Sequence, residues 1–317
     1  MSMSSAACAP EIILTKEHRR FAEFCDACRR YRYIGVCYGP PGVGKTLSAR
    51  CYANWFHLEA YHSYKSLDEN TFATIVGSDT VFYTPKVVSS PRRIEEEIRL
   101  LRNRLRSLAW EKLHREQAAQ QEAVRQEEAA RLRQYLDDPG WRNGVSPLKR
   151  PQTAPTTFDI VKLYAQKRDE TTDPTRLVII DETERLKTVG LEQIRDIFDR
   201  GELGVVLIGM PGLEKRLARY PQLYSRVSFV HEFRPLSAEE VHDLFSQRWV
   251  PAGVVLPTEG LTDAEVLATI IRITGGNFRL LHRLLTQIAR LVEINALSQV
   301  TRGVVEAARE SLVIGAI

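Results

Sequence analysis

The chain has 317 residues, 44% of them hydrophobic and 26% charged, with a formal net charge of +4. This length is typical of about two domains, and the composition supports a full hydrophobic core and excludes disorder throughout the chain. The charge excess is compatible with a nucleic-acid partner but is too small to indicate one. No stretch approaches the roughly 20 apolar residues of a membrane span. Residues 1–10 also lack a signal pattern, so we expect a cytoplasmic protein with no membrane partner.

The first predicted helix begins after Thr15, a possible N-cap, and runs to residue 30. Cys25 and Cys28 lie one turn apart on this helix, beside phenylalanines. The five cysteines of the chain are an odd number for a disulfide framework, and this pair lacks the second pair of ligands that a structural zinc site requires. We therefore expect both thiols on a buried helix face.

A phosphate-binding pattern, G-x-x-x-x-G-K-[ST], follows the apolar strand expected at residues 33–38. Its glycines let the backbone come close to phosphates, Lys45 would bridge the β- and γ-phosphates, and the Thr46 hydroxyl would coordinate Mg²⁺. The helix expected from residue 47 to about 59 adds its positive N-terminal dipole. The residues expected to bind the nucleotide are Gly39, Pro40, Pro41, Gly42, Val43, Gly44, Lys45, Thr46 and Leu47.

Further strands are expected at residues 80–84, 176–181 and 204–208, with a shorter one near 229–230. Helical patterns separate them, notably at 191–200. The third strand is apolar on both faces, as central parallel strands are. Strands that alternate with helices predict an α/β fold with a parallel sheet covered on both sides.

Two carboxylates, Asp181 and Glu182, stand at the end of the third strand. Hydrolysis of a nucleoside triphosphate needs such a pair: Asp181, with Thr46, as a Mg²⁺ ligand, and Glu182 to orient or deprotonate the attacking water. A surface acidic pair is the alternative, but the phosphate loop in the same chain favours the catalytic role. No Asn-Lys-x-Asp segment that would select guanine occurs, so we expect ATP rather than GTP.

The segment from residue 91 to about 135 is rich in Arg, Glu, Gln and Ala, and predicts one long helix or a helical hairpin. It is either a solvated helix laid along the domain or an arm that meets a partner. Its first half has the apolar spacing of a short coiled-coil seam. The seam residues are Ile94, Ile98, Leu101, Leu105 and Leu108.

The pattern becomes entirely helical from residue 233 onward. We therefore divide the chain into an α/β nucleotide-binding core at residues 1–232 and an all-helical lid subdomain at 233–317. The core carries the charged helical insertion, at residues 91–145.

Three segments together resemble the AAA+ ATPases: residues 39–46 as the Walker A motif, 177–182 as Walker B, and Gly-Gly-Asn-Phe-Arg at 275–279 in a helical bundle. The resemblance implies that Arg279 contacts the γ-phosphate as the sensor 2 arginine; an exposed arginine after an interhelical turn is the alternative. It also implies a polar sensor 1 residue at the end of the fourth strand. The residues at 208–212 offer none, so we expect slow hydrolysis or a backbone group that holds the water.

An arginine finger is a further expectation from this resemblance. Arg226 lies where AAA+ proteins keep an arginine that enters the ATP site of a neighbouring subunit, an effect worth about 10³ to 10⁵ in rate. Arg219 is the second candidate, and a surface salt bridge is the alternative role for Arg226. The expected catalytic set is Glu182, Lys45, Arg226 and Arg279.

Within the AAA+ ATPases, residues 14–21, 181–186 and 208–217 are similar to the TniB, TnsC and MuB family of DNA transposition regulators. This resemblance implies a homo-oligomer, ring or helical filament, that assembles with ATP on duplex DNA without sequence preference and recruits or activates a transposase. Hydrolysis would then disassemble it. The candidate DNA-binding residues are Lys86, Arg92, Arg93, Lys149 and Arg150.

Two other functions remain open at this point. A clamp-loader or replication-initiator type of AAA+ loader predicts a dedicated protein partner and a fixed small stoichiometry. An AAA+ signalling switch predicts assembly that depends on ATP and is indifferent to DNA.

Overall fold

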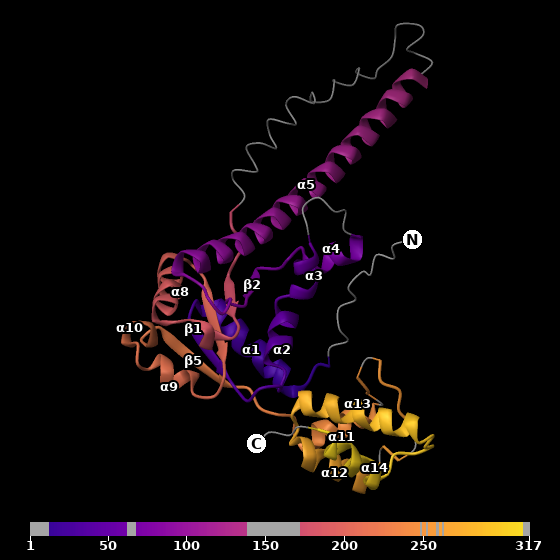
Figure 1. The fold of residues 1–317 in the computed structure, drawn as a ribbon. Coiled ribbons are helices and arrows are strands. Elements are labelled where there is room, and N and C mark those ends of the chain that lie inside the picture. The colour runs from indigo at the N-terminus through magenta and orange to yellow at the C-terminus, as the bar shows by residue number, and fades with distance from the viewer. Residues whose placement is uncertain are drawn as a thin grey trace. The chain divides into compact units, whose positions relative to one another are not determined.

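The computed structural model describes residues 13–61, 68–137, 172–247, 249–251, 253–257, 260–261 and 263–312. The chain forms two compact units. Residues 1–60, 79–98 and 176–317 make up the first, and residues 61–78 and 99–175 the second. The first unit holds the sheet and the C-terminal helices (Figure 1).

A parallel sheet of five strands organises the first unit, in the order β2-β3-β4-β1-β5. Every residue of β2, β3 and β4 is buried, which requires cover on both faces of the sheet. The expected α/β fold class is therefore confirmed. The strands are β1 (Ile34–Tyr38), β2 (Thr80–Tyr83), β3 (Leu177–Ile180), β4 (Gly204–Gly209) and β5 (Val227–Glu232).

The helix α1 (Lys16–Tyr31) packs against β1, β4 and β5. Thr15 caps it as expected, because the Thr15 hydroxyl accepts a hydrogen bond from the His18 amide at 3.0 Å. Cys25 and Cys28 are fully buried on this helix, and burial raises the pKa of both thiols. The described residues contain no cluster of His, Cys, Asp or Glu that could hold a metal ion.

The expected helix over residues 47–59 is wrong in one respect, because the chain forms two helices there, α2 (Lys45–Tyr52) and α3 (Trp55–Ala60). The break lies at Asn54, whose φ of 52° is left-handed. Asparagine adopts this conformation more readily than most residues, so the helix ends without a glycine. The last strand, β5, is also longer than expected and alternates between half-buried and exposed residues, as an edge strand does.

The helices that follow β3 and β4 are short, apart from α8 (Thr188–Arg200). A 3-10 turn, η1 (Thr183–Arg185), comes directly after the acidic end of β3. Two further helices, α9 (Leu213–Leu217) and α10 (Pro221–Tyr224), lead from β4 to β5.

The insertion contains one continuous helix, α5 (Pro91–Asp137), so the hairpin alternative is wrong. Four seam residues are buried by the chain itself, two in each unit, and Leu101 is half-buried. In the second unit the Arg115 guanidinium lies 3.8 Å from the centre of the Phe72 ring, on α4 (Glu69–Ile75). The four buried seam residues are therefore not free for a partner helix: Ile94, Ile98, Leu105 and Leu108.

The C-terminal helices bury their own apolar cluster, which includes residues from Leu236 to Ala308. Ser237 and Glu240 form the capping box that begins the first of these helices. None of the described helices is long and apolar enough to cross a membrane. The four helices are α11 (Ala238–Ser246), α12 (Ala264–Thr274), α13 (Phe278–Ile294) and α14 (Arg302–Glu310).

The burial of the α5 seam gives a test of the fold. Replacing Ile98, which is 1% exposed, by Ala should lower the free energy of unfolding by about 2–5 kcal/mol, because it leaves a cavity in the first unit. Leu100 lies on the same helix but is 65% exposed, so Leu100→Ala should change stability by no more than about 0.5 kcal/mol. Urea unfolding followed by circular dichroism measures both, and equal effects would contradict the burial of the seam.

Candidate functional site

The loop after β1 owes its shape to its glycines. A Cβ atom at Gly39 would lie 2.2 Å from the carbonyl oxygen of Phe233, so no side chain fits there. Gly42 and Gly44 have φ angles of 83° and 109°, in the left-handed region that glycine adopts without strain. The loop therefore turns tightly into the N-terminus of α2, where free backbone N–H groups favour an anion.

Lys45, the first residue of α2, is directed back over this loop. Its ammonium donates hydrogen bonds to the carbonyl oxygens of Gly39 at 2.6 Å and Pro40 at 2.7 Å. Burial lowers the pKa of Lys45, and the nearby carboxylates of Asp181 and Glu184 act in the opposite direction. The chain thus places a half-buried cation at the loop carbonyl groups.

Thr46 and Asp181 meet across the ends of β1 and β3. The Thr46 hydroxyl donates to Oδ2 of Asp181 at 2.6 Å, and the other carboxylate oxygen accepts from the Glu182 amide at 2.9 Å. Asp181 is only 3% exposed. A hydroxyl and a carboxylate are hard oxygen ligands, so this pair fits Mg²⁺, which would neutralise phosphate charge when bound.

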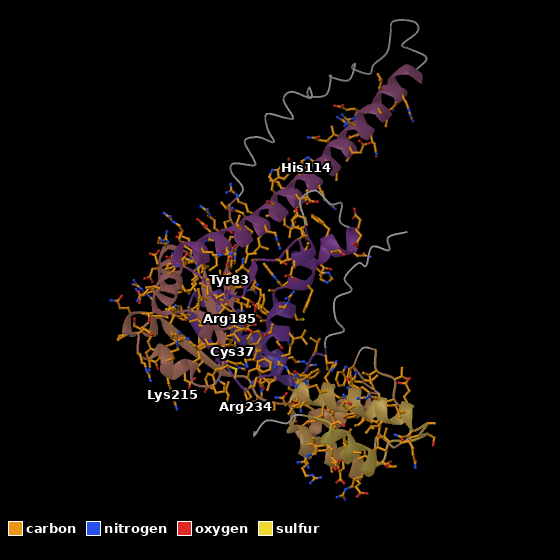
Figure 2. The ribbon with its side chains drawn as sticks, viewed as in Figure 1. Cys37, Tyr83, His114, Arg185, Lys215 and Arg234 are labelled. Carbon is orange, nitrogen blue, oxygen red and sulfur yellow. The ribbon has the colours of Figure 1, made fainter. Side chains whose placement is uncertain are left out.

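Glu182 has a left-handed backbone, with a φ of 48°, and its carboxylate forms an ion pair with Arg185 one turn along. Arg185 in turn donates to the carbonyl oxygen of Pro85 at 3.0 Å. Figure 2 labels Arg185, together with Tyr83 of β2 and Cys37 of β1. The carboxylate predicted to act on water is therefore engaged by a cation of its own turn, and its catalytic role stays a prediction.

The lid reaches the phosphate loop through the first residues of α13. The Asn277 side-chain amide donates to the carbonyl oxygen of Pro41 at 2.8 Å, and the Arg279 backbone N–H donates to that of Gly42 at 3.0 Å. A Cβ atom at Gly42 would lie 2.7 Å from both Asn277 Oδ1 and Arg279 Cβ. The structure thus brings Arg279 to the loop, close enough for its charge to act on Lys45.

The end of β4 offers no polar side chain, as the sequence indicated. The strand ends at Gly209, and the next residue, Met210, is exposed. A residue that the sequence did not single out lies there instead, because Oε2 of Glu184 is 2.8 Å from the position of a Cβ at Gly209. No local pattern points to Glu184, since the contact joins the turn after β3 to the end of β4.

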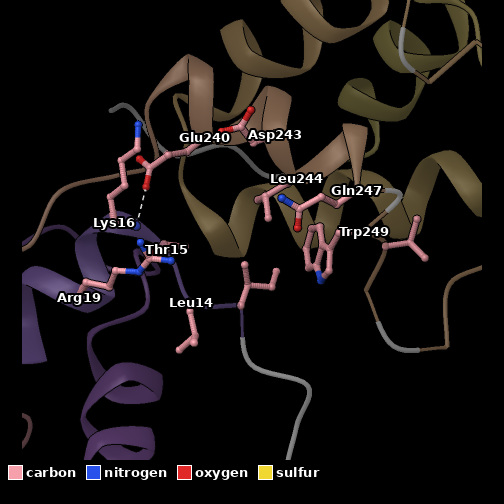
Figure 3. Close-up of a pocket in the computed structure, with 11 residues that line it drawn as sticks. Leu14, Thr15, Lys16, Arg19, Glu240, Asp243, Leu244, Gln247 and Trp249 are labelled. Carbon is pink, nitrogen blue, oxygen red and sulfur yellow. Dashed lines mark hydrogen bonds between the residues drawn. The ribbon is translucent and has the colours of Figure 1, made fainter.

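A pocket of about 770 Å³ lies between the residues that lead into α1 and the lid helix α11 (Figure 3). The Lys16 backbone N–H donates to a carboxylate oxygen of Glu240 at 3.0 Å across it. Leu14 and Trp249 add apolar walls, and the Trp249 ring lies 5.2 Å from that of Phe278, next to Arg279. No residue was expected from the sequence to bind a nucleotide base, and this pocket is a candidate.

The Arg226 side chain is paired with residues of its own chain. Its guanidinium pairs with both carboxylate oxygens of Asp199, at 2.5 and 2.8 Å, and also donates to the carbonyl oxygen of Gln222. Arg219, the second candidate, is exposed and makes no side-chain hydrogen bond or ion pair with the described residues. The ion-pair alternative for Arg226 is thus present in the isolated chain, and a finger role for either arginine stays a prediction.

The candidate DNA-binding residues fall into two groups. Lys86 and Arg93 both pair with Oε1 of Glu97, at 3.1 Å each, so this carboxylate offsets part of their charge. Arg92 is exposed beside them. The other two candidates lie outside the described residues: Lys149 and Arg150.

Comparison with known proteins decides the family. The family model described as an AAA domain matches residues 28–217, which is more than half of the chain. The chain belongs to the AAA domain family. This AAA protein is also similar to a Staphylococcus aureus protein described as a potential ATP-binding protein, with 41% identity over 311 residues that cover 96% of this chain and 97% of the other.

A solved structure shares the fold of this AAA protein. The Aeropyrum pernix ORC1 protein, determined in complex with DNA, matches with a TM-score of 0.50 and 17% identity, over 96% of this chain and 67% of that one. Thermotoga maritima RuvB, a Holliday junction branch migration motor, has a TM-score of 0.47 and 12% identity, over 94% and 69% of the two chains. At 17% identity the likeness to ORC1 concerns the fold alone.

The lid contact at Gly42 gives a test of the site. Gly42→Ala should weaken ATP binding about tenfold or more, because the methyl group meets Asn277 and Arg279. Gly212→Ala is the matched control, since Gly212 also has a positive φ, 95°, but nothing lies within 4 Å of its Cβ position. It carries the backbone strain, about 1–2 kcal/mol, without the clash. Titration with a fluorescent ATP analogue measures both, and equal affinities would show that the lid contact does not shape the loop.

Proposed function

We propose that this AAA protein binds and hydrolyses ATP with Mg²⁺, and that its ATP-bound form assembles on duplex DNA as a homo-oligomer that regulates transposition. Hydrolysis then disassembles the oligomer. The observation that carries the nucleotide part is the meeting of Lys45, the Thr46–Asp181 pair and the lid residue Arg279 around one loop.

The chemistry of this site suits a triphosphate. The loop amides and Lys45 supply positive charge for the phosphates, and Thr46 with Asp181 supplies oxygen ligands for Mg²⁺. Glu182, which directly follows the proposed Mg²⁺ ligand Asp181, would orient or deprotonate the attacking water once its ion pair with Arg185 is released. The pocket walled by Leu14 and Trp249 is our candidate for the adenine, because bases bind in apolar pockets with a few polar groups.

Duplex DNA is proposed as the partner on two grounds. The segments at residues 14–21, 181–186 and 208–217 are similar to the TniB, TnsC and MuB type of regulator. The neighbour of like fold, ORC1, is described in complex with DNA, which makes duplex DNA the first partner to test. Binding through phosphates predicts a steep salt dependence without sequence preference.

The assembly itself gives the main test. With duplex DNA and a slowly hydrolysed ATP analogue, the protein should sediment as large oligomers that electron microscopy shows as rings or filaments on DNA, and ADP should abolish them. Lys45→Ala should also abolish them, because the loop loses its phosphate cation. Lys215→Ala, which removes an exposed lysine on α9, should leave assembly unchanged.

The competing functions predict other results in the same experiment. Assembly with ATP that is equally strong without DNA would contradict the transposition role and favour a signalling switch. A fixed small complex that forms only with a further protein would favour a loader.

The finger candidates give a second test. Arg226→Ala should retain ATP binding but lose about 10³-fold in the hydrolysis rate of the assembled protein. Mixing it with Lys45→Ala should partly restore activity. The Arg226→Ala subunit still binds ATP, and a Lys45→Ala subunit, which does not assemble alone, can join it and supply Arg226 to that ATP. Arg219→Ala, tested in the same mixtures, serves as the comparison. If neither arginine variant is rescued, neither acts across a subunit boundary.

A further inference from the structure

The end of β4 carries no polar side chain. Gly209 is the last residue of the strand and pairs with Tyr38, the residue before the phosphate loop. This places the end of β4 between the loop and the acidic end of β3. Neither Gly209 nor the exposed Met210 that follows offers a polar side chain there.

The carboxylate of Glu184 occupies the end of β4 instead. Glu184 lies in η1, the turn that follows β3, and β3 is the strand next to β4. A Cβ atom at Gly209 would lie 2.8 Å from Oε2 of Glu184, so this carboxylate lies directly against the glycine. The turn that carries it is fixed from α9, because Arg216 donates to the carbonyl oxygen of Glu184 at 3.1 Å and also to that of Leu186. Any side chain at position 209 would compete with the Glu184 carboxylate for the same space.

The two glutamates after Asp181 differ in their partners. Glu182 is paired with Arg185, whereas the Glu184 side chain is exposed and makes no hydrogen bond or ion pair with the described residues. Glu184 is also near enough to the phosphate-bridging cation to act on it, since it opposes the lowering of the Lys45 pKa by burial. An unpaired acceptor thus lies at the end of β4, where the resemblance to the AAA+ ATPases implies a polar side chain.

We propose that Glu184 accepts a hydrogen bond from the attacking water and so takes the part of the polar side chain that β4 lacks. This rests on the proposed ATP hydrolysis, in which water attacks the γ-phosphorus, the bond to the β–γ bridging oxygen breaks, and ADP, phosphate and a proton are released. Glu184 orients the water in this step. This role requires a hydrogen-bond acceptor oxygen and does not require a negative charge, so the side-chain amide of glutamine can replace the carboxylate in part.

The test compares four variants in steady-state hydrolysis and in binding of a fluorescent ATP analogue. Glu184→Ala should lower kcat about 10²-fold while the dissociation constant changes less than about threefold. Glu184→Gln should recover about a third or more of wild-type kcat, because it keeps an acceptor. Glu202→Ala is the matched control, since Glu202 is exposed and paired with Arg32 just before β4 begins, and it should have no effect.

Gly209→Ala completes a double-mutant cycle. Alone it should lower kcat about tenfold, because the methyl group displaces the carboxylate, but in the Glu184→Ala background it should cost less than about twofold. Equal losses in both backgrounds would assign the effect to the other neighbour of that position, Leu213 at 2.9 Å, and would overturn the proposal.

The results distinguish failure of the role proposed for Glu184 from failure of the proposed ATP hydrolysis. Hydrolysis that is unchanged in Glu184→Ala overturns this proposal and leaves ATP hydrolysis in place. A Glu184→Gln variant as slow as Glu184→Ala would also overturn it, because the residue would then act through its charge. A wild-type protein that binds no ATP would overturn the proposed function itself, and the role of Glu184 with it.

Discussion

Two hydrogen bonds between the lid and the phosphate loop are the constraint on which the rest of the site depends. Asn277 and the Arg279 backbone bond the carbonyl oxygens of Pro41 and Gly42, and the missing side chain of Gly42 makes this approach possible. With its carbonyl groups held from the lid side, the loop can turn its N–H groups toward phosphates. The proposed nucleotide site therefore includes the first turn of α13. A change in the loop reaches the lid through the same bonds.

The four C-terminal helices share one buried apolar cluster. Arg226, the candidate arginine finger, suits a site to which a neighbouring subunit would contribute a residue. Arg226 is held by Asp199 at a partly exposed position, where an ion pair contributes only about 0–1 kcal/mol. A neighbouring subunit that offered phosphate charge could therefore release it at small cost. In the proposed function, such an arrangement would link the hydrolysis rate to oligomerisation.

Local patterns predicted much of the fold: the order of strands and helices, the loop at residues 39–46 and the acidic end of β3. The sequence could not locate the break at Asn54, which depends on a single left-handed residue inside a helical pattern. It also could not decide whether the seam of α5 meets a partner or the chain's own core, because both give the same spacing. Glu184 and the pocket at Trp249 were missed for a related reason. Each depends on segments that are distant in the chain or that meet only at strand ends.

Hydrogen–deuterium exchange of the whole protein, with and without the slowly hydrolysed ATP analogue, tests most directly whether lid and loop act together. We predict that the analogue slows exchange both in the loop at residues 39–46 and at the start of α13, residues 277–281, where Arg279 and Leu281 donate to the loop and to the helix. Protection confined to the loop, with no change at the start of α13, would contradict the account.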